Sequence, residues 1–158
     1  MIGTIPPGAE LDATGPPQGP RIAVRVSGWS LEGAPAQLFR AVGRRILQAE
    51  LGSRGPSRPV VADRQTDPYG SVWQRVSASG WVARSDVGPD LDAVWKQAES
   101  LYQQRCGGCH ALHPATEFTA NQWPNVLKVM AHNAAFTPEQ AALVTQYLQT
   151  HAKDGGAS

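Results

Sequence analysis

The stretch that decides the fold and its chemistry is Cys106-Gly107-Gly108-Cys109-His110. Two cysteines with two residues between them and a histidine directly after form the CxxCH pattern of covalent haem attachment. Each thiol can add to one of two neighbouring vinyl groups at the porphyrin edge, and the histidine can give a ring nitrogen to the iron. The two glycines let the backbone pass close to the ring. The motif therefore predicts one covalent haem c, attached to Cys106 and Cys109, with His110 as the proximal iron ligand.

Other uses of a cysteine pair fit this sequence less well. The chain of 158 residues contains only these two cysteines, and a disulfide between them would close too small a loop to stabilise a fold. A thiol-redox pair is expected at the start of a helix in a thioredoxin-like βαβ unit, whereas this pair follows a helical pattern. A zinc site would need a second Cys/His pair at finger spacing, although His113 is nearby. Haem attachment is preferred over these alternatives.

The iron has a second axial position, and Met130 is the preferred candidate for it. It is the only methionine after the first residue, and a thioether ligand favours ferrous iron and raises the reduction potential relative to two histidines. His132 is the rival, but from a regular helix it could not point in the same direction as Met130. An open position is the third possibility. His113 lies too close to the motif to cross the ring, and His151 is expected at the surface.

Residues after Pro89 have helical periodicity. A first helix is predicted behind Asp90, and its apolar positions recur at helical spacing: Leu91, Val94, Trp95, Ala98, Leu101 and Tyr102. A last helix is predicted from Thr137-Pro138-Glu139-Gln140, which combines a capping box with proline at the first helical position. A shorter helix is expected at residues 124–132. The first and last helices should cross with Trp95 and Tyr147 in their contact, and Trp123 is expected to shield one haem face.

Residues 1–89 have the pattern of strands and turns. Arg21-Ile22-Ala23-Val24-Arg25-Val26 alternates between apolar and other residues, and 72–76 and 81–83 are further strand candidates. Residues 36–51 could form a short helix or a long strand. Residues 52–58 are rich in turn-forming types and predict a loop.

A weak internal repeat supports a small β fold. Residues 24–29 (VRVSGW) resemble residues 76–81 (VSASGW), and each is a strand pattern that leads into Gly-Trp. Two such units predict an SH3-like barrel of about five strands, although two coincidental Gly-Trp pairs would look the same. The expected architecture is thus α+β in two parts: an SH3-like β domain at 1–89 and an all-α monohaem cytochrome c domain at 90–158.

Composition excludes several classes of protein. The net charge is +1, with no basic patch that would suggest nucleic-acid binding. No apolar run approaches the roughly 20 residues that cross a bilayer, and the first residues lack the features of a signal peptide. A leader or a membrane-anchored portion is therefore expected to be absent from this chain. No paired carboxylates, Ser-His arrangement or phosphate loop suggests an enzyme.

The chain resembles a known family over residues 5–152. The stretches that carry the likeness are 106–112 (CGGCHAL), 118–123 (FTANQW), Met130, 43–47 (GRRIL) and both Gly-Trp pairs. They resemble the carboxy-terminal monohaem region of the TorC/DorC-type pentahaem c-type cytochromes of trimethylamine N-oxide and dimethyl sulfoxide respiration. The tetrahaem portion of that family is missing here. Pro124 is not expected in the family, and it would begin a helix rather than lie within one.

The resemblance implies a function. It implies a periplasmic carrier that takes electrons from a membrane-anchored multihaem cytochrome and passes them to a molybdenum-cofactor reductase, with His110 and Met130 as axial ligands. A haem-based sensor would instead need a displaceable sixth ligand. The β domain could also bind a partner through a groove lined by Trp29, Trp73 or Trp81, or these side chains could simply pack its core.

Overall fold

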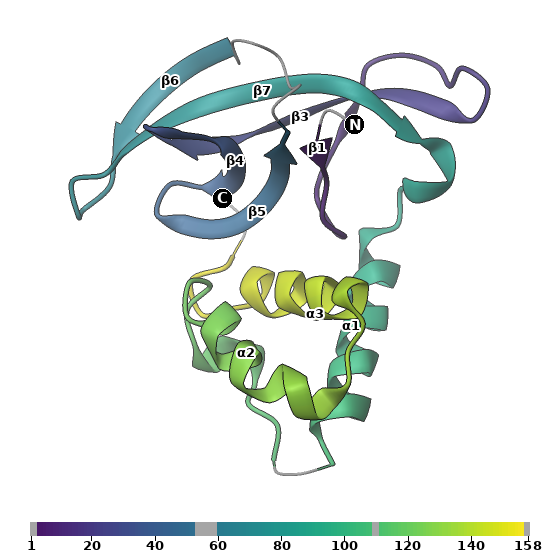
Figure 1. The fold of residues 1–158 in the computed structure, drawn as a ribbon, viewed down its shortest axis with the longest axis vertical. Coiled ribbons are helices and arrows are strands. Elements are labelled where there is room, and N and C mark those ends of the chain that lie inside the picture. Colours follow the sequence, from purple (N-terminus) through teal and green to yellow (C-terminus); the bar gives the residue numbers. More distant parts are fainter. Residues whose placement is uncertain (1–2, 53–59, 109–110, 157–158) are drawn as a thin grey trace. The chain divides into compact units, whose positions relative to one another are not determined.

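Residues 3–52, 60–108 and 111–156 are described in the computed structural model of the chain, without the side chains of 60–62, 131 and 132. The chain divides into two compact units. One contains Met1–Ile5 and Ala9–Pro89, and the other contains Pro6–Gly8 and Asp90–Ser158. Strands make up the first unit and helices the second, as Figure 1 shows. An α+β protein in two parts is therefore confirmed.

The first unit is a single antiparallel sheet. Its strands are β1 (Gly3–Thr4), β2 (Asp12–Ala13), β3 (Arg21–Leu31), β4 (Ala34–Ala41), β5 (Arg44–Leu51), β6 (Val60–Thr66) and β7 (Val72–Ala83). They pair in the order β1-β5-β4-β3-β7-β6, and β2 pairs with β3 beside this path.

The predicted closure into an SH3-like barrel is not confirmed, because this path ends at β1 and β6 and leaves an open sheet of seven described strands. β3 and β7 pair continuously from Arg21↔Ala83 to Leu31↔Trp73 with no shift in register, whereas the β3–β4, β4–β5 and β6–β7 pairs each contain one or more register shifts. The sheet therefore bends, but a closed barrel also requires its two edge strands to pair. The described residues of β1 and β6 pair with β5 and β7 instead.

The strands predicted at 21–26, 72–76 and 81–83 all lie within strands of the sheet. The pattern at 21–26 is the start of β3, with Val24 and Val26 buried, and the candidates at 72–76 and 81–83 are the two ends of β7. Residues 36–51 form neither a helix nor one strand. They form most of the hairpin of β4 and β5, which turns at Gly43 with a φ of 74°. Glycine adopts this left-handed conformation without strain. The loop predicted at 52–58 lies almost wholly outside the described residues.

The two Gly-Trp segments lie side by side in β3 and β7. Val24 pairs with Gly80 and Gly28 pairs with Val76, so the two segments run antiparallel against each other. At Gly28 a Cβ atom would lie 2.8 Å from the carbonyl oxygen of Phe39, so β4 can approach only because the side chain is missing. Trp29 is partly buried, whereas Trp81 is 49% exposed.

Trp73 anchors the turn between β6 and β7. It is 2% exposed and packs edge-on against Phe39, with ring centroids 5.9 Å apart. Its indole N–H donates to Asp67 Oδ2 at 2.9 Å, while Asp67 Oδ1 accepts from the backbone N–H groups of Tyr69 and Ser71, each at 2.9 Å. Trp73 thus packs the β unit rather than lining a groove. These hydrogen bonds, led by that from Trp73, lower the pKa of Asp67.

Asp67→Asn is expected to destabilise the protein at neutral pH and much less in acid. The pKa of Asp67 in the folded state lies below its ordinary 3.8, so its ionisation stabilises the fold above that value. The contribution disappears as the pH falls through the lowered pKa. Urea unfolding of the wild type and the variant between pH 7 and pH 2 checks this. A difference in urea midpoint that stays constant over the whole range would contradict it.

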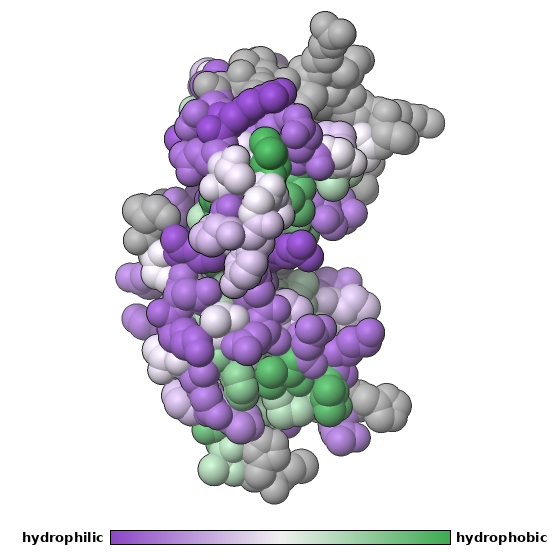
Figure 2. Space-filling model, turned by 90° about the vertical axis from the view of Figure 1, so that its left-hand side faces the viewer, coloured by the Kyte–Doolittle hydropathy of each residue, from purple (hydrophilic) through white to green (hydrophobic). Residues whose placement is uncertain are grey.

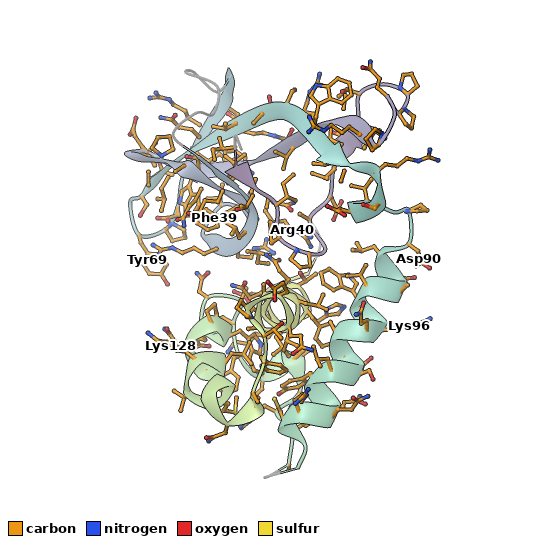
Figure 3. The ribbon with its side chains drawn as sticks, turned by 45° about the vertical axis from the view of Figure 1, so that its right-hand side comes forward. Phe39, Arg40, Tyr69, Asp90, Lys96 and Lys128 are labelled. Atoms are coloured by element: carbon orange, nitrogen blue, oxygen red, sulfur yellow. The ribbon has the colours of Figure 1, made fainter. Side chains whose placement is uncertain are left out.

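The second unit consists of helices joined by short irregular segments. They are α1 (Leu91–Cys106), the 3₁₀ turn η2 (Ala115–Glu117), α2 (Trp123–Ala134) and α3 (Pro138–Thr150); a further 3₁₀ turn, η1 (Arg84–Asp86), ends the first unit. No helix in the described ranges is both long and apolar enough to cross a membrane. Polar faces turn outward, as Lys96 on α1 and Lys128 on α2 show in Figure 3.

Local signals set the helix ends. Asp90 accepts a hydrogen bond from the backbone N–H of Ala93 at 2.9 Å, and Thr137 and Gln140 form the predicted capping box. Pro124 lies in the first turn of α2, where its missing N–H costs nothing. The predicted helix starts are confirmed.

The α1–α3 contact forms the core of this unit. Trp95 and Tyr147 meet with ring centroids 6.4 Å apart, as predicted, and Ala98 and Leu143 complete the buried cluster. Gly8, with a φ of +75°, lies directly on the Trp95 ring, where a side chain would clash.

Candidate haem attachment site

The attachment motif begins where α1 ends. Cys106 is the last residue of α1 and is 8% exposed, and the N–H of Gly107 closes the helix by donating to the carbonyl of Gln103 at 3.1 Å. Helical periodicity places Cys106 one turn beyond Tyr102, on the buried face. Cys109 and His110 lie outside the described residues, so their predicted roles stay predictions.

The two motif glycines differ in their surroundings. A Cβ atom on Gly107 would lie 2.7 Å from the carbonyl oxygen of Gln103, so the helix end itself requires glycine there. A Cβ atom on Gly108 would meet no described atom within 4 Å. Gly108 is exposed, so no described atom restricts what can lie beside it.

Met130 lies in the second half of α2 and is partly exposed. On the same helix Trp123 and Leu127 are buried, while Val129 is 80% exposed. Met130 thus lies at the border between the buried stripe and the open face. Hydrophobic side chains also gather on one face of the helical unit in Figure 2. The side chain of the rival ligand, His132, is not described.

The other two histidines contact protein groups. His113 Nδ1 lies 2.9 Å from Glu117 Oε2, and its ring packs on Phe118 at 5.4 Å between centroids. His151 Nδ1 lies 2.8 Å from the carbonyl oxygen of Tyr147, and its exposed ring contacts Trp95. The exposed His151 ring agrees with its predicted place at the surface, while the exclusion of both histidines as the sixth ligand stays a prediction.

Trp123 is fully buried at the start of α2. Its indole N–H donates to the carbonyl of Ala115 at 2.8 Å, and its ring meets Phe118 and Tyr102 edge-on at 5.0 and 6.4 Å. Its predicted place against the haem stays a prediction.

The chain end fixes the segment between the motif and α2. Gln149 Nε2 donates to the carbonyl of Ala120 at 2.8 Å, and the N–H of Ala120 donates to Asp154 Oδ1 at 2.7 Å. The N–H of Lys153 also donates to the carbonyl of Phe118 at 3.3 Å. These contacts could not be predicted from the sequence, because no pattern around a glutamine or an aspartate reveals a distant backbone partner.

Gln149→Ala is expected to lower the free energy of unfolding by about 1–3 kcal/mol, because it leaves the buried carbonyl of Ala120 without its donor. Urea unfolding measures this change. The matched control is Gln103→Ala, on the exposed side of α1, which should change stability by less than about 0.5 kcal/mol. Equal effects of the two substitutions would contradict the assigned role of Gln149.

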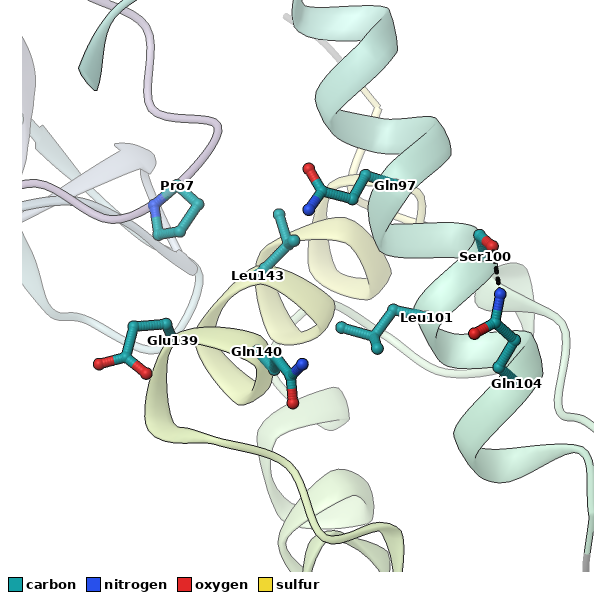
Figure 4. Close-up of a pocket in the computed structure, with 8 residues that line it drawn as sticks. All are labelled: Pro7, Gln97, Ser100, Leu101, Gln104, Glu139, Gln140 and Leu143. Carbon is teal, nitrogen blue, oxygen red and sulfur yellow. Dashed lines mark hydrogen bonds between the residues drawn. The ribbon is translucent and has the colours of Figure 1, made fainter. Parts of the chain in front are cut away.

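An open groove of about 430 Å³ runs between α1 and α3 (Figure 4). Leu101 and Leu143 contribute its apolar part, and the hydrogen-bonded pair Ser100–Gln104 lies on its rim. Glu139 is the only ionisable side chain among the described residues that line it: Pro7, Gln97, Ser100, Leu101, Gln104, Glu139, Gln140 and Leu143. The groove thus lacks the pair of titratable groups that acid–base catalysis uses.

The described residues fit a covalent haem. They provide a buried thiol at a helix end, open space beside Gly108 and a partly covered thioether on a neighbouring helix. A helix that leads into CxxCH, followed by a helix with a candidate axial methionine, defines the class of c-type cytochromes.

Comparison with known proteins gives the particular family. The chain belongs to the family described as "TorC third cytochrome c domain", whose model matches residues 2–87. A second family model, "Dihaem cytochrome c", matches residues 102–158. The resemblance to TorC-type cytochromes is therefore confirmed. The first match covers the β unit, so this unit belongs to the family as well.

Individual relatives align with nearly the whole chain. It is 30% identical over 154 residues to the cytochrome c-type protein TorY of Escherichia coli O157:H7, which covers 97% of this chain and 42% of that protein. It is 31% identical to TorY of Haemophilus influenzae, with coverage of 86% and 37%, and 28% identical to TorC of Escherichia coli K12, with 84% and 35%. The chain thus spans about two fifths of these relatives. No solved structure matches it.

Proposed function

We propose that this chain is a periplasmic monohaem c-type cytochrome module. It passes electrons from a membrane-anchored multihaem, quinol-oxidising module to a molybdenum-cofactor terminal reductase of S- or N-oxides. The observation that carries the proposal is the CxxCH motif at the end of α1, in a chain that belongs to the TorC-type family.

The motif and the resemblance to the family support a set of haem-binding residues. Cys106 and Cys109 would hold the haem through two thioether bonds, His110 and Met130 would ligate its iron, and Trp123 would pack against it. Bound haem supplies a one-electron couple. With two cysteines in the chain, two thioether bonds account for one haem, even though the family model that matches residues 102–158 is named for two.

The polypeptide would tune this group rather than react with substrate. The hydrogen bonds and aromatic contacts around residues 102–123 support a fixed scaffold for the ligands. A thioether in the sixth position favours a carrier over a sensor, because a sensor or gas binder needs an open or readily displaced site. Carbon monoxide binding to the reduced wild type within seconds at neutral pH would favour the sensor.

The partners and the compartment are proposed from the family. The similarity to TorC and TorY supports a place in trimethylamine N-oxide respiration. Covalent haem attachment and electron delivery to such a reductase would then both occur in the periplasm.

The test is electron delivery by the purified holoprotein. The chain is exported in cells that contain haem-ligation machinery, reduced, and mixed anaerobically with a trimethylamine N-oxide or dimethyl sulfoxide reductase. Adding the matching oxide should reoxidise the haem, which absorbance follows, while no oxidation occurs without the oxide or without the enzyme. A holoprotein that stays reduced with each reductase would contradict the proposed acceptor, although haem attachment would stand.

A further inference from the structure

A closed cycle of contacts among four residues links the ligand-bearing segments of the helical unit; three contacts join aromatic rings and one joins a hydroxyl to a backbone carbonyl. The hydroxyl of Tyr102 donates to the carbonyl of His113 at 3.0 Å, and the His113 ring packs on Phe118 with centroids 5.4 Å apart. Phe118 meets Trp123 edge-on at 5.0 Å, and Trp123 meets Tyr102 edge-on at 6.4 Å. The members come from α1, from the segment after the motif and from the first residue of α2.

The position of this cycle matters for the iron ligands. Tyr102 lies one helical turn before Cys106, His113 follows His110 by three residues, and Trp123 begins the helix that carries Met130. The segment between Gly108 and Trp123 contains only one short 3₁₀ turn, η2, among its described residues. Regular secondary structure therefore does little to fix it. Side-chain contacts and isolated backbone hydrogen bonds, such as that from Lys153 to Phe118, hold it in place.

His113 is held from three sides. Tyr102 binds its carbonyl, Glu117 binds its ring nitrogen at 2.9 Å, and Phe118 packs on its ring. Tyr102 is 5% exposed, and burial raises its pKa to about 12, so the hydroxyl remains a donor throughout the physiological pH range. His113, which is fixed in this way, follows His110 by only three residues.

We infer that Tyr102 is a positioning residue: its hydroxyl, through His113, fixes the segment that carries the proximal histidine relative to the helix that carries Met130. This inference rests on the proposed haem ligation. It assigns to Tyr102 a role in strengthening the Met130–iron bond that goes beyond packing in the core.

The test compares Tyr102→Phe with a matched control, Tyr147→Phe. Both substitutions remove one partly or fully buried hydroxyl in the same helical unit. The hydroxyl of Tyr147 lies close to Glu99 on α1, whereas that of Tyr102 donates to the backbone carbonyl of His113. Imidazole is titrated into each oxidised holoprotein, and the far-red Met-to-iron absorption band reports displacement of Met130. Thermal unfolding is measured on the same samples.

Tyr102→Phe should bind imidazole roughly fivefold more tightly than the wild type, as expected from the loss of one hydrogen bond, while Tyr147→Phe should bind it as the wild type does. Equal imidazole affinity of Tyr102→Phe and the wild type would overturn the inference, even if the variant unfolds at a lower temperature. Equal tightening in both variants would also overturn it, because that result indicates general loosening.

A third variant tests the same inference if Tyr102→Phe does not fold. Glu117→Gln weakens the hold on the same residue, His113, from a partly exposed position. It should also tighten imidazole binding, and an unchanged affinity would then count against the inference. A wild type without covalent haem would instead refute the proposed function, so the two failures are distinguishable.

Discussion

The variant in which Cys106 and Cys109 are both replaced by alanine is expected to contain no covalently bound haem. Each thioether bond requires one of these thiols at the porphyrin edge, and the chain has no other cysteine that could substitute. Wild-type protein made with haem-ligation machinery should keep its pigment in acidic acetone and show the added mass of one haem. The double variant should lose all colour in the same extraction.

Replacing only one of the two cysteines gives a further expected result, which absorbance measures. Each leaves one vinyl group unreacted, so any haem that attaches should absorb at a longer wavelength than in the wild type, because conjugation is extended. Cys106→Ala should also disturb folding at the end of α1, where the thiol is buried. A double variant that retains acid-stable haem would refute attachment at this motif.

The helical half of the fold could be predicted well from the sequence, because local interactions define it. The Asp90 cap, the Thr137–Gln140 capping box and Pro124 all act within one turn of the chain, and each marks a helix start that the structure confirms. The Trp95–Tyr147 contact could be predicted too, because both residues lie on the single apolar stripe of their helix.

The sheet could be predicted only in part, because its architecture depends on pairings distant in sequence. Alternation identified strand segments, but it could not show that 72–76 and 81–83 belong to one long strand. Nor could it show whether β1 and β6 would meet and close a barrel. Gly43 was the local signal for the β4–β5 hairpin, and the helical alternative at 36–51 obscured it.

The functional site, too, could be predicted only in part. The sequence alone identifies the motif residues and Met130 as candidates, because their residue types and spacing are informative. It does not identify the contacts that hold the segment between them. Gln149 binds a backbone carbonyl 29 positions away, and Tyr102 binds one 11 positions away. A backbone carbonyl is present at every residue, so no sequence pattern reveals which one a side chain will choose.

Met130→Ala is expected to remove the sixth iron ligand and to change the haem more than any other single substitution outside the motif. The oxidised wild type should show the far-red Met-to-iron band, and the variant should lack it. The reduced variant should bind carbon monoxide rapidly, because its sixth position is open. Electron delivery to the reductase should fall, since a coordination change on each redox cycle slows transfer.

Two further variants separate loss of the ligand from loss of the helix. Met130→His keeps a sixth ligand but exchanges thioether for imidazole. Its reduction potential should fall by roughly 0.1 V or more, a fraction of the roughly 0.8 V range over which axial ligands set haem potentials. His132→Ala should leave the band and the potential as in the wild type. If His132→Ala abolishes six-coordination while Met130→Ala preserves it, the iron is held by two histidines, and the module would operate at a lower potential than a methionine-ligated carrier.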